Sequence, residues 1–193
     1  MNPGILEHQV AFVSLRWTCT NCEDHGIDPA CEICTSKNSP LNRTKSWSWY
    51  NCDDPLTDFV YFVLTEFEPK HETILWAHNG GRFDSHFVMQ ILYRMKLQPQ
   101  LVMTGLKIYD ISVKMKGHSQ LHFRDSYLVL QTPLESLKKT FNLDVEEKMF
   151  FPYLFCRREN MHNNSLVLPP LEDYIPSSMK LEKHAKFMVF YFV

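Results

Sequence analysis

The chain has 193 residues, of which 45% are hydrophobic and 22% charged, a balance that predicts a globular protein and excludes an intrinsically disordered one. This length is enough for one domain with a substantial core, with or without a small additional module. The formal net charge of -2 excludes a protein that is basic throughout, so any contact with nucleic acid must depend on local sites.

Neither end of the chain predicts a membrane segment. The first 12 residues lack the basic stretch followed by an apolar stretch that marks a signal peptide. The last seven residues, FMVFYFV, are apolar, whereas a bilayer span needs roughly 20 such residues. Because an apolar end exposed to water promotes aggregation, we expect this chain to be part of a longer protein.

Four of the six cysteines form two close pairs near the N-terminus, Cys19-x-x-Cys22 and Cys31-x-x-Cys34. Each pair can place two thiolates on a tight turn, and together they offer the tetrahedral sulfur set that zinc prefers. Two disulfides are the alternative, although nothing in the sequence indicates an oxidising compartment. His25 lies between the pairs as either a substitute ligand or an ordinary loop residue, and Cys52 and Cys156 are expected to be packed thiols.

Polar, turn-rich residues 35–55 predict a linker that leaves the cysteine region. A dense apolar repeat then predicts a buried helix over residues 56–67, with Asp54 or Thr57 as its cap. A short strand is expected over residues 73–78, and a second helix begins just after Asp84.

Beyond Pro99 the apolar residues recur with a period of two. This pattern predicts two strands, residues 101–115 and 119–129, joined in a hairpin through Gly117. Residues 132–143 then predict a helix, and the Pro- and Asn-rich residues 160–179 predict an extended surface segment.

The stretch WAHNGGRFDSHF combines an expected strand, a tight turn, an acid and a helix start. Asp84 could therefore present its carboxylate at the edge of the sheet, where a divalent cation with oxygen ligands could bind. Gly80 and Gly81 would allow a sharp turn and the close approach of a ligand. Asn79 could bind a sugar or phosphate, and Phe83 could stack on a base. The alternative is a structural turn in which Asp84 caps the following helix.

The same stretch resembles the second exonuclease motif, Asn-x(2-3)-Phe/Tyr-Asp, of B-family DNA polymerases, and in particular of the protein-primed group from organelles, viruses and Maverick/Polinton-type mobile elements. The segments LKIYDISVK and LHFRDSYLVLQTPLESLKKTFNL follow in the order of that family, and YIPSSM with AKFMVFY resembles the stretch before its third exonuclease motif. The paired cysteines resemble an insertion in some mobile-element polymerases, so the resemblance covers nearly the whole chain.

The resemblance implies an α/β chain with the RNase H-like exonuclease fold, a mixed sheet flanked by helices, here incomplete and carrying a small cysteine-rich insertion. The domains implied are a partial strand region at residues 1–18, a cysteine-rich insertion expected to bind zinc with its linker at 19–52, an exonuclease-like core at 53–160, and an extended segment with a truncated C-terminus at 161–193.

The chemistry implied is two-metal hydrolysis of DNA from its 3' end with Mg²⁺ or Mn²⁺, in which one ion generates the attacking hydroxide and the other stabilises the leaving oxygen. By resemblance, Asp84 is the catalytic metal-binding acid, while Asn79 and Phe83 contact the single-stranded primer end. Ser126 begins a segment similar to the primer-binding motif Ser/Thr-Leu-x-x-hydrophobic, with Tyr127 in the place of the motif's Leu. The pattern of FRDSYLVL alone would instead indicate a half-buried strand.

The family's partners are DNA, a terminal protein that primes synthesis, and the remainder of the polymerase chain. Its members act in the nucleus or in the mitochondrion, and this sequence has no segment that decides between those compartments. The resemblance therefore implies a DNA-directed DNA polymerase with a 3'-5' exonuclease.

The first exonuclease motif, Asp-x-Glu, is absent between Met1 and Arg16, and the third, Tyr-x-x-x-Asp, is not found after the FMVFY segment. The letters of these motifs occur at Asp144 to Glu146 and at Tyr50 to Asp54, but out of order. One acid does not hold two cations against their hydration, so we expect the isolated chain to be nearly inert. A zinc-containing module that binds single-stranded DNA and a non-functional mobile-element remnant are the alternatives.

Overall fold

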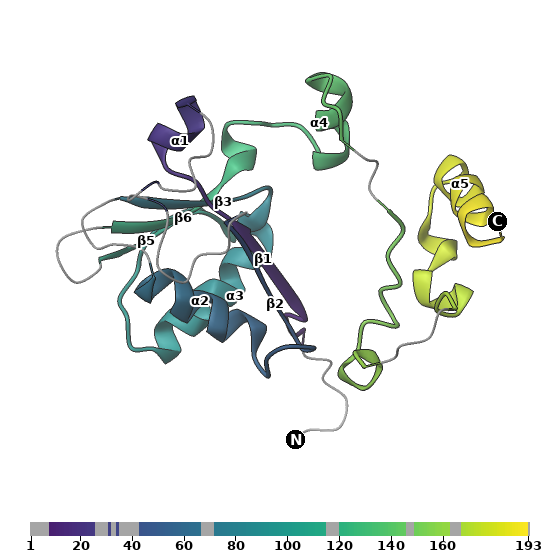
Figure 1. Cartoon of the computed structure of the whole chain (residues 1–193), viewed down its shortest axis with the longest axis horizontal. Coiled ribbons are helices and arrows are strands. Elements are labelled where there is room, and N and C mark those ends of the chain that lie inside the picture. Colours follow the sequence, from purple (N-terminus) through teal and green to yellow (C-terminus); the bar gives the residue numbers. More distant parts are fainter. Residues whose placement is uncertain are drawn as a thin grey trace. The chain divides into compact units, whose positions relative to one another are not determined.

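The computed structural model describes residues 8–25, 31, 34, 43–66, 72–114, 120–145, 149–162 and 167–192. The chain divides into two compact units, Met1–Thr132 and Pro133–Val193, which are considered separately below (Figure 1).

The first unit contains a four-stranded sheet with the strand order β3-β6-β5-β4. The pairing of β3 with β6 is parallel, whereas β6 with β5 and β5 with β4 are antiparallel, so the expected mixed sheet is confirmed. The strands are β3 (Thr73–Ala77), β4 (Gln100–Thr104), β5 (Lys107–Lys114) and β6 (Gln120–Asp125).

The single strand predicted over residues 101–115 is wrong, because β4 and β5 are separate strands that pair with each other. Gly105 lies in the turn between them with φ of 60°, a left-handed conformation that glycine adopts without steric cost. Apolar residues recur on both sides of this turn, so the pattern reads as one long strand unless Gly105 is taken as a break. The antiparallel pairing of β5 with β6 agrees with the predicted hairpin, whose turn at Gly117 lies outside the described residues.

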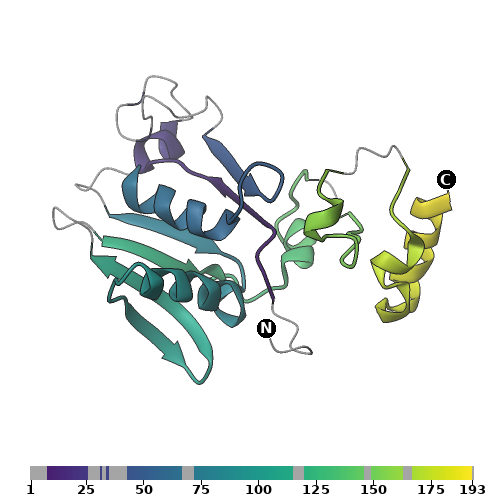
Figure 2. The same cartoon turned by 90° about the horizontal axis from the view of Figure 1, so that it is seen from below.

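Two helices, α2 (Pro55–Thr65) and α3 (Asp84–Arg94), lie side by side on one face of this sheet (Figures 1 and 2). Asp54 caps α2, as one of the two predictions had it, and its carboxylate accepts a hydrogen bond from the Thr57 amide at 3.1 Å. The buried residues that these elements share form one core: Leu56, Phe59, Val60, Val63, Val88, Ile91, Leu92, Ile108, Ile111, Val113, Leu121 and Phe123.

The segment predicted as a linker contains a strand, β2 (Thr44–Ser48), which pairs antiparallel with β1 (Phe12–Arg16). Trp47 explains the difference, because its ring is buried against Phe59 and Phe62 of α2 and ties this Ser- and Thr-rich strand to the core. The short helix α1 (Thr20–His25) follows β1 and carries part of the cysteine region.

The second unit has a small aromatic core around Phe187 of α5 (Leu181–Phe192), whose ring contacts Tyr174, Phe150 and Tyr191. The predicted helix over residues 132–143 is present as α4 (Leu134–Thr140). The segment expected to be extended contains 3-10 turns at Leu171–Tyr174 and Pro176–Ser178. In the part of the chain that the structure describes, no helix has both the length and the apolar character needed to cross a bilayer.

Candidate nuclease-like site and cysteine cluster

Two segments that are about 40 residues apart in the sequence meet at one edge of the sheet. Because β3 and β6 run parallel, with Ala77 opposite Asp125, their carboxyl ends lie at the same edge. The turn from Asn79 to Asp84 follows β3, and Ser126 and Tyr127 follow β6. The structure thus brings both predicted DNA-binding segments into one place.

The turn after β3 is shaped by close backbone packing. Asn79 has the left-handed conformation, with φ of 59°, and Gly80–Arg82 form a single 3-10 turn. A Cβ atom on Gly81 would overlap the carbonyl oxygen of Ile108 in β5, and one on Gly80 would lie 2.8 Å from the Cβ of Ala77. The two glycines therefore allow the predicted sharp turn and let it pack against the sheet, while the close approach of a ligand stays a prediction.

Asp125 anchors this turn, although no sequence pattern singles it out. Its carboxylate is buried, accepts a hydrogen bond from the Tyr127 amide at 2.9 Å, and lies 3.2 Å from the Lys107 ammonium of β5. Burial alone would raise the pKa of Asp125, but the amides of Tyr127 and Asn79 together with Lys107 outweigh it, so the pKa is lowered. Asp125 stays ionised and joins β5, β6 and the start of the turn.

Asp84 has the opposite electrostatic setting. It stands in the first turn of α3 and is exposed as a residue, yet burial of its carboxyl and the nearby charge of Asp125 raise its pKa. The helix has Phe83 at its cap position without a side-chain hydrogen bond, so the alternative in which Asp84 caps α3 is not supported. Two carboxylates thus lie close together, one neutralised by protein groups and one not.

A cavity of about 230 Å³ adjoins Asp84, between β1, β3 and the two helices. Its walls are largely apolar and include Phe12 and Leu15 of β1 and Leu75 of β3. Among the described residues, β1 pairs only with β2 and β3 only with β6. Each of these strands therefore has an edge without a strand partner in the described part of the chain, next to this cavity.

His78 holds the segment after β6, and sequence reasoning missed it as well. Its Nε2 lies 2.8 Å from the Thr132 carbonyl oxygen, so Nε2 carries the proton, and its Nδ1 accepts from the Ser126 hydroxyl at 3.1 Å. The ring of Tyr127 packs edge-on against His78 and lies 4.7 Å from the Lys107 ammonium. Ser126 and Tyr127 are thus oriented by groups on β3 and β5.

Phe83 differs from Tyr127 in its exposure. Its side chain is 54% exposed, and its ring contacts Phe87 of α3 and His8 edge-on. An aromatic ring that is positioned by its neighbours and still has about half of its surface in solvent is suited to stack on a base. Tyr127, which packs against His78 and Lys107, has less free surface for that contact.

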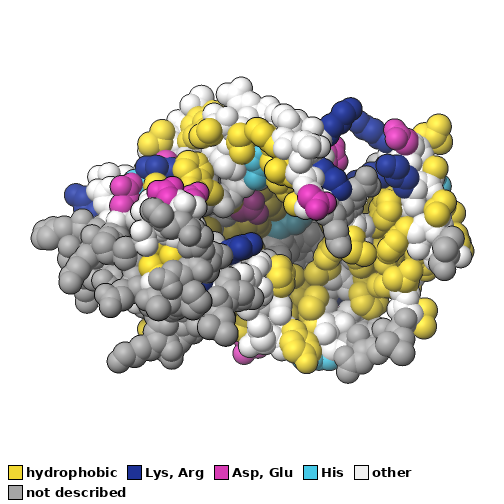
Figure 3. All heavy atoms as spheres, turned by 45° about the horizontal axis from the view of Figure 1, so that its top comes forward, with side chains coloured by type: hydrophobic (Ala, Val, Ile, Leu, Met, Phe, Trp, Pro, Cys, Tyr) yellow, Lys and Arg dark blue, Asp and Glu magenta, His cyan; other side chains and the backbone are white. Residues whose placement is uncertain are grey.

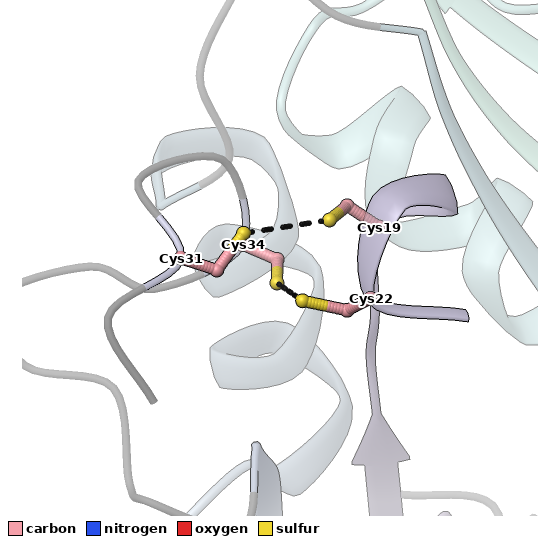
Figure 4. Close-up of side chains that lie close together, drawn as sticks. All are labelled: Cys19, Cys22, Cys31 and Cys34. Carbon is pink, nitrogen blue, oxygen red and sulfur yellow. Dashed lines mark hydrogen bonds between the residues drawn. The ribbon is translucent and has the colours of Figure 1, made fainter. Parts of the chain in front are cut away.

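The four paired cysteines form a compact cluster at the far end of the β1–β2 hairpin (Figure 4). Cys19 and Cys22 come from the start of α1 and Cys31 and Cys34 from the loop that follows, and their sulfur atoms all lie within 4.8 Å of one another. The pairs Cys19/Cys31 and Cys22/Cys34 have sulfur atoms 3.6 Å apart, and all four cysteines are free thiols. Burial and hydrogen bonds with the other thiols raise the pKa of Cys34 to about 12, so this thiol stays protonated near neutral pH unless a cation binds.

This arrangement fits a metal ion better than two disulfides. Four sulfur ligands at the usual zinc distance stand roughly 3.8 Å from one another in a tetrahedron, close to the separations here. A disulfide would need the sulfur atoms at about 2.05 Å. The side chain of His25 lies outside the described residues, and four sulfur ligands already complete a tetrahedral set.

The described surface has no continuous basic patch on the face drawn in Figure 3, where lysine and arginine side chains lie in small separate groups among hydrophobic ones. On this face, contact with an anionic ligand would depend on local groups.

Comparison with known proteins decides the family. The model of the DNA polymerase type B family, organellar and viral, matches residues 63–183, which is more than half of the chain. The chain belongs to this family. The matched region of this type B polymerase chain includes both the turn at Asn79 to Asp84 and the segment at Ser126 and Tyr127, whereas the cysteine cluster lies before it.

One relative of this type B polymerase chain is the DNA-directed DNA polymerase of Enterobacteria phage PRD1, which is 31% identical over 116 residues. The match covers 56% of this chain and 19% of the phage protein, so the chain spans about a fifth of the length of that relative. No solved structure matches the chain. The coarse prediction of a B-family polymerase sequence is confirmed.

Proposed function

We propose that this chain forms the proofreading region of a DNA-directed DNA polymerase, with an RNase H-like arrangement that removes nucleotides from the 3' end of a single-stranded primer. The single observation that carries the proposal is the parallel pairing of β3 with β6. This pairing joins Asn79, Phe83 and Asp84 to Ser126 and Tyr127 at one edge of the sheet. Residues that would hold the primer and an acid that would hold a cation thus occur together.

In this proposal each predicted residue has a distinct task. Phe83 offers its exposed face to the terminal base, and Asn79 offers an amide to the sugar or phosphate. The Ser126 hydroxyl already donates to His78, so its oxygen lone pairs remain to accept a hydrogen bond from the primer. Tyr127 lies beside the expected path of the DNA strand.

Asp84 is the residue that would hold Mg²⁺ or Mn²⁺, ions that would supply two-metal hydrolysis when bound. Its raised pKa fits this task, since a partly desolvated carboxylate beside another acid gains from a bound cation. Asp125 does not fit as a second free ligand because its oxygens already meet Lys107 and the Tyr127 amide. One available carboxylate among the described residues does not complete a two-metal site, so further ligands would have to come from outside them.

We propose the cavity beside Asp84 as the place where those ligands enter. A strand lying between β1 and β3 would pair with their free edges, bury apolar side chains in the cavity and bring its acids close to Asp84. The expected occupant is a strand of the polymerase that carries the Asp-x-Glu motif. DNA and a terminal protein primer are the external partners that this proposal implies.

The experiment measures binding of a fluorescent single-stranded oligonucleotide to the purified chain at fixed low salt, because affinities for DNA depend on salt. Phe83→Ala should weaken binding about 10-fold, since loss of one base-aromatic stack costs on the order of 1–3 kcal/mol. Tyr93→Ala is the matched control, because Tyr93 is 53% exposed at the other end of α3. Equal affinities of both variants and the unaltered chain would remove the stacking role and its support for the proposal.

The same oligonucleotide tests for hydrolysis. We expect at most weak trimming by the chain alone with Mg²⁺ or Mn²⁺, because the described residues supply one available carboxylate at the site. Strong trimming that Asp84→Ala abolishes would overturn the expectation of inertness while supporting the proposed site.

For the cysteine cluster we propose zinc as the bound ion. Four cysteine sulfurs in a tetrahedral set are typical of structural zinc sites. Metal analysis of the purified chain should find one zinc per chain, lost in Cys22→Ser and retained in Cys52→Ser, whose thiol lies outside the cluster and donates to the Ser48 carbonyl.

A further inference from the structure

Arg43 is a buried arginine beside the four cysteines. Its residue is 1% exposed, and it is the largest of the fully buried side chains. The guanidinium lies within interaction range of the Cys22, Cys31 and Cys34 side chains. No sequence pattern singles Arg43 out, because it is 9 residues after Cys34 and in a polar stretch.

A buried guanidinium is stabilised most strongly by nearby negative charge. Four thiolates around a divalent ion form a centre with a net charge of about -2, whereas four protonated thiols carry none. The position of Arg43 beside the cysteines therefore suits a metal-bound cluster better than four protonated thiols.

The backbone of Arg43 is also held in a defined conformation. Arg43 has φ of 48°, a left-handed conformation that is costly for a residue with a side chain. Its carbonyl oxygen accepts from the Trp17 amide at 3.1 Å, one step beyond the last strand pair, Arg16 with Thr44. Trp17 in turn donates from its indole nitrogen to the Cys34 carbonyl oxygen at 3.1 Å. These contacts connect the end of the β1–β2 hairpin with the cluster.

We propose that Arg43 is the positioning residue of the zinc centre: its guanidinium hydrogen-bonds the sulfur of Cys22 and offsets part of the centre's negative charge. This role rests on the proposed zinc ion and is independent of the nuclease proposal. By hydrogen-bonding the sulfur, Arg43 makes the zinc-bound thiolate a poorer nucleophile and harder to protonate, which slows alkylation and proton-assisted loss of the metal.

The test compares zinc-loaded chains carrying Arg43→Met or Arg43→Lys with the unaltered chain. Methionine has a similar length and the same backbone preferences but no charge, whereas lysine keeps the charge without the planar fork. Arg16→Met is the matched control, because Arg16 is an exposed arginine at the end of β1. The measurements are the rate of zinc transfer to a coloured chelator and the rate of cysteine alkylation by iodoacetamide, followed by mass spectrometry.

Arg43→Met should accelerate both rates by about 10- to 100-fold, the usual effect of removing a partner of a metal ligand. Arg43→Lys should restore part of the protection, and Arg16→Met should leave both rates unchanged. Cobalt substituted for zinc adds a readout that packing alone would not move, because loss of the hydrogen bond should shift the sulfur-to-cobalt charge-transfer band of Arg43→Met. If Arg43→Met does not fold, Arg43→Gln keeps a donor for Cys22 without the charge and should accelerate both rates less strongly.

The two proposals fail in different ways. If the unaltered chain, with all thiols reduced, binds neither zinc nor cobalt, the zinc proposal is overturned and Arg43 loses its role with it. If the unaltered chain holds zinc and both rates and the cobalt spectrum are the same in Arg43→Met, the zinc proposal stands and the role of Arg43 is overturned.

Discussion

The acid turn and the cysteine cluster differ in how the chain assembles them. The residues of the acid turn come from separate strands, and the parallel pairing of β3 with β6 brings them together. The ligands of the cluster come from one stretch of 16 residues, Cys19 to Cys34, that returns on itself. The first site therefore depends on the sheet, whereas the second can be organised by a metal ion with few contacts to the rest of the unit.

The two sites also differ in how negative charge is offset. At the acid turn a protein cation, Lys107, meets Asp125, whereas Asp84 forms no salt bridge with the described residues and its pKa is raised. At the cluster a buried arginine stands beside the sulfur atoms. Each site thus contains one basic residue, Lys107 at the acid turn and Arg43 at the cluster. A metal ion would neutralise the negative charge that these residues leave, on Asp84 and on the cysteine thiolates.

The largest loss of stability is expected from Asp125→Ala, which alters the acid turn and not the cysteine cluster. This change leaves Lys107 and the Tyr127 amide without their acceptor, and we expect it to cost about 2–4 kcal/mol of the free energy of unfolding. All four tryptophans lie in the first unit, so their fluorescence in urea measures the loss. Asp144→Ala, at an exposed position, should change stability by less than about 0.5 kcal/mol.

Hydrogen exchange on Asp125→Ala locates that loss. Amides at the ends of β3 and β6 should exchange faster, while those of β1 and β2 next to the cluster should keep their protection. Equal loss of protection at both places would show that the cluster depends on the sheet as much as the acid turn does, and the contrast drawn above would fail.

Local patterns predicted the helices α2 and α3, the strand β3 and the paired cysteines, because each is visible within one window of sequence. The strand β2 and the turn at Gly105 were missed, because one depends on burial of Trp47 against α2 and the other interrupts no periodicity. At the sites, the motif indicated Asp84 but not Asp125, and the spacing indicated the cysteines but not Arg43. The supporting residues were invisible because their partners lie on other strands or across a loop, where no sequence spacing records them.

A second, smaller effect tests the account of the glycines. Gly81→Ala should cost about 1–3 kcal/mol, since its Cβ would meet the Ile108 backbone, which does not move as easily as a side chain. Gly105→Ala should cost about 1 kcal/mol or less, because the space around it is open and only its positive φ is unfavourable. Urea titrations of both variants compare the two costs, and a larger loss in Gly105→Ala would contradict the close packing of the acid turn.

The smallest effect concerns the ionisation of Asp84. Its pKa is raised in the folded chain, so the folded state binds the proton more tightly than the unfolded state, and stability falls as the pH rises from the ordinary range of an aspartate through the folded pKa. Asp84→Asn removes this loss. It should therefore be more stable than the unaltered chain at pH 7, by less than about 1 kcal/mol because solvent screens an exposed carboxylate, and equally stable near pH 3. Urea unfolding at the two pH values measures the difference.

Lower stability of Asp84→Asn at pH 7 would mean that the favourable interaction of the carboxylate with the start of α3 outweighs its burial beside Asp125. Higher stability of Asp84→Asn at pH 7 would show that the ionised Asp84 destabilises the fold. A cation bound to the carboxylate would make the unaltered chain the more stable of the two.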